Sequence, residues 1–120
     1  MENEEVYYKL VRDEVPTHLD KQREKGVSYK SEILSDKDYL NALVRKLNEE
    51  ATELESCVEG KNGNTKEEIA DVLEVIDALV VALGFNMDEI RRIQEEKRNK
   101  KGGFTKRIFL KTVTDPTKKK

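Results

Sequence analysis

Two apolar helical patterns joined by a short glycine-containing turn constrain this sequence most. Leucine, valine and isoleucine recur at helical spacing over residues 40–58 and again over residues 69–83. Gly60 and Gly63 stand between the two patterns, and glycine is the residue type that most readily ends helices and forms turns. The sequence therefore predicts two consecutive helices that fold back on each other as a helical hairpin.

Helix-capping signals indicate where these two helices begin. Ser35 precedes the first apolar pattern, and Thr65 stands three residues before Glu68 at the start of the second. A Ser or Thr followed three residues later by an acid forms a capping box, which satisfies free backbone N–H groups. The helix that begins at Thr65 is apolar over more than half of its circumference. We therefore expect it to be the central and most buried helix.

Two further helices flank the predicted hairpin. Asp13 is a candidate N-cap for a weakly apolar helix that continues to Lys25 and ends at Gly26. Asn86 is a candidate N-cap for a fourth helix that continues to about Lys100, before a pair of glycines. The expected fold class is therefore all-α, with a bundle of about four helices around a central helical hairpin.

Some segments have a weaker, extended pattern. Residues 6–11 are a candidate extended piece, and residues 28–34 and 105–113 are candidates for a short accessory β-ribbon. At 120 residues the chain is expected to form one domain. We assign that domain to residues 1–113 and treat residues 114–120 as a basic C-terminal tail.

Composition bears on the compartment. No apolar run approaches the roughly 20 residues that a membrane-spanning helix needs, so no membrane association is expected. The N-terminus is acidic and lacks the basic start and apolar core of a signal peptide. Cys57 is the only cysteine and cannot form an internal disulfide. These features favour a cytoplasmic protein.

Charge is distributed unevenly along the chain. Residues 97–120 carry ten Lys or Arg and one acid, whereas residues 1–96 carry thirteen basic and twenty-four acidic residues. A basic segment of this kind can bind nucleic acid, or it can lie near an acidic site, or it can simply be solvated. The acidic remainder of the chain would repel phosphate in the absence of a metal, which disfavours nucleic-acid binding.

Four acids carry the strongest chemical signal. Glu50 and Glu53 on the first hairpin helix, and Glu68 and Asp71 on the second, are each three residues apart. Like charges at this helical spacing repel by roughly 0.2–0.5 kcal/mol per pair. A helical wheel places Glu68 inside the apolar arc and the other three at the edge of the hairpin contact. A cluster of inward-facing carboxylates needs a counter-charge, and an all-oxygen ligand set favours Mg²⁺ or Mn²⁺.

The wheel also separates these acids from their neighbours. Glu49 points away from the apolar stripe, and Glu74 and Asp77 fall on the polar side despite having the same three-residue spacing. The alternative interpretation is that all of these are surface acids of Glu-rich helices. In that case they would pair with Lys46 or Lys66.

The acid pattern as a whole resembles a known signature. Glu49-Glu50-x-x-Glu53, followed by Glu68-x-x-Asp71, is similar to the motif of the MazG-like, all-α nucleoside triphosphate pyrophosphohydrolase superfamily, which includes the phosphoribosyl-ATP pyrophosphohydrolases. Two flanking segments resemble the start and the end of a small MazG-like subgroup: KLVRD over residues 9–13, and KGGF with KRI over residues 101–108.

This resemblance implies a helical bundle that assembles as a dimer or tetramer, with the site completed near a subunit interface. It also implies Mg²⁺-dependent cleavage between the α and β phosphates, which yields a nucleoside monophosphate and pyrophosphate. The metal-binding positions of the motif correspond to Glu50, Glu53, Glu68 and Asp71. Glu49, Glu50 and Glu53 are the candidate catalytic residues, one of which would act as general base.

Basic side chains are expected to bind the triphosphate and stabilise the departing pyrophosphate. The candidates are Arg12, Lys97, Lys100, Lys101 and Arg107. Phosphoribosyl-ATP hydrolysis is a less favoured alternative, because the Tyr-His pair that often follows the second acid motif is replaced by Glu-Val. A non-catalytic helical interaction module is the other alternative, and the identity of the nucleotide is open.

Overall fold

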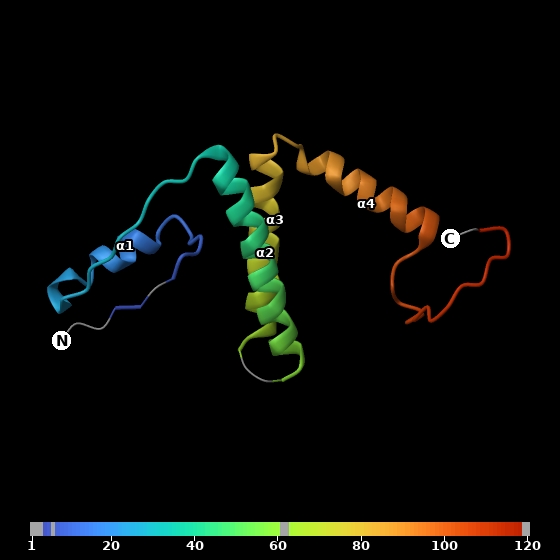
Figure 1. Cartoon of the computed structure of the whole chain (residues 1–120), viewed down its shortest axis with the longest axis horizontal. Helices are drawn as coiled ribbons and strands as arrows, with labels where there is room; N and C mark the ends of the chain where they lie inside the picture. The colour runs from blue at the N-terminus through green and yellow to red at the C-terminus, as the bar shows by residue number, and fades with distance from the viewer. Residues whose placement is uncertain (1–3, 6, 61–62, 119–120) are drawn as a thin grey trace. The chain divides into compact units, whose positions relative to one another are not determined.

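The computed structural model describes residues 4–5, 7–60 and 63–118, and within them the protein is all-α, without β-strands. The elements in order are α1 (Val15–Asp20), the 3₁₀ turn η1 (Arg23–Lys25), α2 (Asp36–Val58), α3 (Thr65–Ala82) and α4 (Met87–Lys101) (Figure 1). The chain divides into two compact units, Met1–Phe85 and Asn86–Lys120. The expected fold class, with four α-helices in the described residues, is confirmed. None of the helices in these residues is long and apolar enough to cross a membrane.

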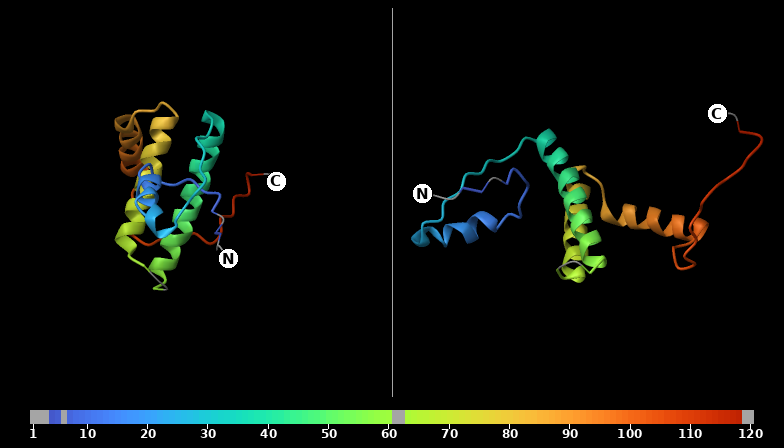
Figure 2. Two further views of the ribbon diagram at one scale, coloured as in Figure 1. Left: turned by 90° about the vertical axis from the view of Figure 1, so that its left-hand side faces the viewer. Right: turned by 60° about the horizontal axis from the view of Figure 1, so that its bottom comes forward.

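The hairpin of α2 and α3 is the core of the first unit. The two helices lie side by side in every view (Figures 1 and 2). Four side chains are buried among the described residues: Leu43 and Cys57 from α2, and Val75 and Val80 from α3. Burying such apolar side chains is the main source of folding free energy, so the hairpin contact stabilises this unit.

Side-chain caps start the three longer helices. Ser35 Oγ accepts a hydrogen bond from the backbone N–H of Asp38 (3.2 Å), which confirms the predicted start of α2. Asn86 caps α4 in the same way, through the N–H of Asp88 (2.7 Å). On α3 the cap is Asn64, one residue earlier than predicted. Its Oδ1 accepts from two backbone N–H groups and leaves Thr65 inside the first turn.

The turn between α2 and α3 uses glycine where the backbone requires it. Gly60 and Gly63 have φ values of +78° and +72°, a conformation that glycine adopts without steric cost. A Cβ atom at Gly63 would lie 3.0 Å from the Sγ atom of Cys57. The turn therefore closes tightly against the end of α2. Residues 61–62 of the predicted turn lie outside the described residues, as do Val6 of the predicted extended piece and residues 119–120 of the tail.

The first helix is shorter than predicted. α1 ends at Asp20, and a separate 3₁₀ turn follows before Gly26, so the prediction of one helix from Asp13 to Lys25 was wrong. The N-cap position is Glu14, which makes no side-chain capping hydrogen bond. Neither α1 nor the 3₁₀ turn contains a buried residue. Helices this short depend on packing rather than on intrinsic propensity, so nothing extends this one.

The predicted β-ribbon is absent from the described residues. Residues 28–34 and 105–113 contain no strand. Each segment has apolar side chains that are solvent-exposed, with Ile33 at 99% and Ile108 at 80%. A two-stranded ribbon is marginal without a packed face, so β-propensity alone does not form strands here.

Helix α3 carries apolar side chains that α2 leaves partly uncovered. Ile69 and Leu73 are each 47% exposed, and Val81 is 77% exposed. Among the described residues of the first unit, α2 is the long helix that packs against α3. Part of the apolar arc of α3 therefore faces solvent within the single chain.

Substitution of Leu43 tests the hairpin core, because this residue is only 2% exposed. We expect Leu43→Ala to lower the free energy of unfolding by about 3 kcal/mol, because a buried leucine loses both its transfer free energy and its packing. Urea denaturation followed by circular dichroism measures this change. Ile33→Ala removes a fully exposed side chain and should alter stability by no more than about 0.5 kcal/mol. Equal losses for the two variants would contradict this description of the core.

Candidate metal site

Three carboxylates converge across the α2–α3 contact. Glu50 comes from α2, and Glu68 and Asp71 come from successive turns of α3. Each offers an oxygen atom that lies within 4.8 Å of the others. The three-residue spacing on α3 places Glu68 and Asp71 on one face, and the packing of the hairpin sets Glu50 opposite them. The Glu50 side chain is only 12% exposed. The hairpin thus brings together three of the four acids predicted as metal ligands.

Glu68 is the most constrained of the three. Its Oε2 atom is buried and has no hydrogen-bond partner among the described residues. Interaction with the Glu50 carboxyl raises the pKa of Glu68, and burial and the charges of Glu50, Asp71 and Glu53 raise it further. Burying a carboxylate oxygen without a partner is unfavourable. A cation bound among these oxygens would satisfy it, so the residues present fit a metal ion.

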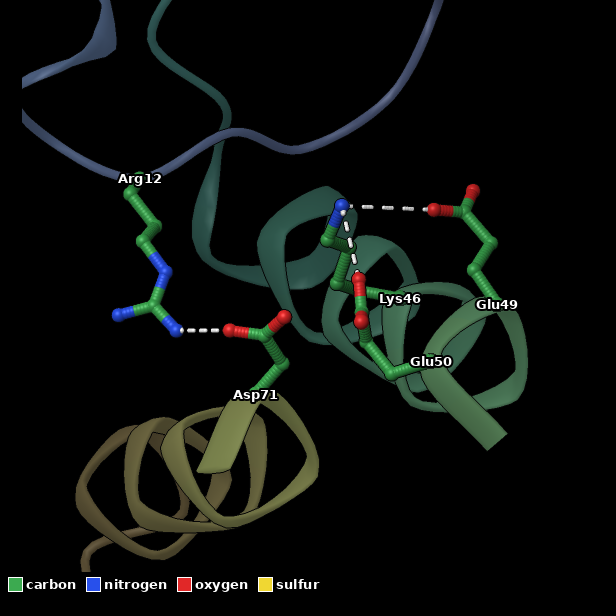
Figure 3. Close-up of polar contacts among 5 residues, drawn as sticks. All are labelled: Arg12, Lys46, Glu49, Glu50 and Asp71. Atoms are coloured by element: carbon green, nitrogen blue, oxygen red, sulfur yellow. Dashed lines mark hydrogen bonds and ion pairs between the residues drawn. The ribbon is translucent and has the colours of Figure 1, made fainter. Parts of the chain in front are cut away.

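Lys46 compensates part of the negative charge. Its Nζ atom lies 3.4 Å from Glu50 and 3.5 Å from Glu49 (Figure 3). The Lys46 side chain is only 20% exposed, so this ion pair is partly shielded from water. The sequence contained the signal, since Lys46 and Glu50 are four residues apart on one helix. From the sequence alone, Lys46 is assigned only to the alternative in which the acids are surface residues.

Arg12 reaches the site from a distant part of the chain. Its Nη2 atom donates a hydrogen bond of 2.6 Å to Oδ1 of Asp71 on α3 (Figure 3). The segment of residues 9–13 that carries Arg12 forms one wall of a cleft of about 430 Å³. The other walls are formed by Val15, by Tyr39, Leu43, Lys46 and Glu50 of α2, and by Asp71, Glu74, Val75 and Ala78 of α3. The cleft therefore opens beside two of the three clustered carboxylates.

The remaining predicted acids lie at the periphery. Glu53 is exposed and outside the group of three, although its charge contributes to the raised pKa of Glu68. Glu49 is 46% exposed and pairs with Lys46. Glu74 and Asp77 are exposed, as the helical wheel predicted, and Glu74 borders the cleft.

The other predicted phosphate-binding residues belong to the second unit, which is described by itself. Lys97, Lys100 and Lys101 are exposed on the last turns of α4, and Arg107 is exposed in the following turn. Arg107 has a φ of +60°, and its backbone N–H donates to the carbonyl of Phe104 (3.1 Å). Residues 101–109 enclose a hollow of about 600 Å³ within this one loop.

The chemistry of the cluster is that of a hard-cation site. Its three ligand groups are carboxylates, and neither histidine nor cysteine belongs to the group. Oxygen ligands suit Mg²⁺ and Mn²⁺ rather than zinc.

Comparisons of the chain with protein-family models, with curated proteins and with solved structures give no match.

The raised pKa of Glu68 predicts a pH-dependent stability of the metal-free protein. Because the pKa is higher in the folded than in the unfolded chain, the contribution of Glu68 to stability is most favourable at low pH and is lost as the pH rises through the folded value. In the presence of a chelator, the melting temperature of Glu68→Gln should therefore rise relative to that of the wild type as the pH increases from acidic to neutral values. Thermal unfolding followed by circular dichroism measures this difference.

Asp77→Asn is the matched control, because Asp77 is an exposed acid on the same helix. The melting temperature of Asp77→Asn should depend on pH in the same way as that of the wild type. A Glu68→Gln profile parallel to that of the wild type would contradict the assignment of an unfavourable buried charge to Glu68.

Proposed function

We propose that this protein is a Mg²⁺-dependent nucleoside triphosphate pyrophosphohydrolase of the MazG-like type that its motifs resemble. It would cleave the bond between the α and β phosphates to give a nucleoside monophosphate and pyrophosphate. The observation that carries the proposal is the convergence of Glu50, Glu68 and Asp71, together with the unpartnered buried oxygen of Glu68. These three acids occupy metal-binding positions of the resembled motif.

The acids of the cluster and their neighbours have separate proposed roles. Glu50, Glu68 and Asp71 would hold the ion, and Glu53, one turn beyond Glu50, is the fourth acid of the motif. When bound, Mg²⁺ would offset the charge of the triphosphate and make a nearby water more acidic. Glu53 and Glu49 are solvent-accessible and are the candidates to accept a proton from that water.

The cleft beside the cluster supports phosphate binding. It has a volume of about 430 Å³, and its charged lining combines Lys9, Arg12 and Lys46 with four acids, Asp13, Glu50, Asp71 and Glu74. Phosphate binding there therefore needs the metal to offset the acids. Preorganised positive charges stabilise a departing pyrophosphate. Lys97, Lys100, Lys101 and Arg107 remain proposed contributors from the basic second unit.

The proposal is tested by measuring pyrophosphate release from a panel of nucleoside triphosphates. We expect release with Mg²⁺ and none with EDTA. Glu68→Gln, Asp71→Asn and Glu53→Gln should each lower kcat/KM by more than about 100-fold, beyond what is typical of residues that only support a ligand. Glu55→Gln, an exposed acid on α2, is the control and should retain activity.

Two outcomes separate the alternatives. Full activity of Glu53→Gln would remove Glu53 from the site. Binding of Mg²⁺ without pyrophosphate release from any nucleotide would instead support a non-catalytic helical module.

We also propose that the chain associates with a second copy of itself through α3. The exposed apolar side chains of α3, including Ile69 and Leu73, lie one helical turn apart and form a stripe that α2 does not cover. Contiguous exposed apolar surface marks interaction sites. A second copy of this chain is the proposed occupant, because symmetric self-association is the commonest way to cover such a face. The result would be a dimer, or a tetramer if two such interfaces are used.

This assembly predicts a molecular mass above that of the single chain at micromolar concentration, measured by light scattering. Leu73→Glu should shift the protein toward the monomer, because a charge placed in an apolar interface is strongly disfavoured. Ile33→Glu is the control, since Ile33 is fully exposed and lies outside α3. A monomeric wild type would overturn the assembly.

A further inference from the structure

The cleft contains two cations that are held in different ways. Lys46 and its partner Glu50 lie on the same helix, four residues apart, so α2 itself keeps them together. Arg12 and its partner Asp71 are separated by 59 residues. Arg12 lies in a non-helical segment that ends in a backbone turn, where its carbonyl accepts from the N–H of Val15 (3.1 Å). The Arg12 contact is therefore the one that can be broken without disturbing a helix.

The ion pair between Arg12 and Asp71 is also weak. One nitrogen of the guanidinium reaches one oxygen of Asp71, and the two side chains are 59% and 36% exposed. Exposed ion pairs of this kind contribute little to stability. Asp71 meanwhile belongs to the group of three acids whose oxygens lie within 4.8 Å of one another. Arg12 thus occupies a carboxylate that a metal ion would also use.

We propose that Arg12 and the metal ion exchange at Asp71, and that Arg12 is thereby released to bind the phosphates of the nucleotide. The inference rests on the proposed function and deepens it. In the metal-free protein Arg12 serves as the counter-charge of Asp71. In the loaded protein its guanidinium, still on the wall of the same cleft, is free to bind phosphate oxygens with its planar set of donors.

The exchange predicts that loss of Arg12 changes the affinities for metal and for phosphate in opposite directions. Removing Arg12 removes a competitor for Asp71, so metal binding should tighten. The same change removes a phosphate ligand, so binding of a phosphate compound to the metal-loaded protein should weaken. A residue that merely orients Asp71 would weaken metal binding when lost, and a purely solvated residue would alter neither.

The experiment compares Arg12→Gln with the wild type by isothermal titration calorimetry, using the full chain. Mg²⁺ alone is titrated first, and inorganic pyrophosphate is then titrated at saturating Mg²⁺. We expect Mg²⁺ to bind about two- to fivefold more tightly, the range that losing an exposed ion pair allows. Pyrophosphate should bind at least about tenfold more weakly, as for a lost charge-assisted contact.

Two control variants separate exchange from a general change in charge. Lys9→Gln removes a positive charge from the same segment, but Lys9 lies over the Tyr7 ring (5.3 Å to its centre) rather than on Asp71. Arg23→Gln breaks a comparable exposed ion pair with Asp20 (3.0 Å) outside the cleft. Tightening of Mg²⁺ binding should be largest for Arg12→Gln, and Arg23→Gln should match the wild type.

Hydrogen exchange gives a readout that is independent of affinity. In the wild type, Mg²⁺ should speed amide exchange in residues 9–13, because the segment loses its contact with α3. Unchanged exchange there, or Mg²⁺ affinity that is equal or weaker in Arg12→Gln, would overturn the inference. Failure of the wild type to bind Mg²⁺ at all would instead contradict the proposed metal site on which the inference depends.

Discussion

The packing of α2 against α3 is the constraint on which the rest of the molecule depends. The side chains that this contact buries, such as Leu43 and Val75, occupy the same helix faces as acidic residues. The hairpin therefore cannot close its apolar contact without bringing Glu68 against Glu50. The raised pKa of Glu68 is the electrostatic consequence of apolar packing. The carboxylate group that could hold a metal therefore borders the core, and its geometry depends on the stability of the hairpin.

The positive charges around the cluster offset part of its negative charge. Each of two carboxylates has a cationic partner, Lys46 for Glu50 and Arg12 for Asp71, while the third, Glu68, is shifted toward its protonated form. Partial neutralisation of this kind lowers the repulsion among three acids. The same cations face the cleft in which a triphosphate would bind. The charges that offset the acids in the metal-free chain are thus the ones that the proposed function assigns to phosphate binding.

Local periodicity accounts for what the sequence could predict. The helical wheel places Glu50 and Glu68 at the contact because both lie on long helices with clear apolar faces. Capping residues indicate where those helices begin, to within one residue for α3. Lys46 was within reach of the same reasoning through its four-residue spacing from Glu50. The contact of Arg12 with Asp71 was not, because it joins a non-helical segment to a helix 59 residues away. Motif resemblance indicated a role for Arg12, but only the fold supplied its partner.

The site and the proposed assembly surface use different sides of α3. At about 100° per residue, Glu68 and Asp71 project well away from Ile69 and Leu73, and the second pair is the exposed one. A second copy covering those residues would stabilise α3 without entering the cleft. Because the hairpin buries few side chains of its own, that added contact would hold Glu68 and Asp71 in place against the repulsion among the acids. Self-association and metal binding would then support each other through one helix.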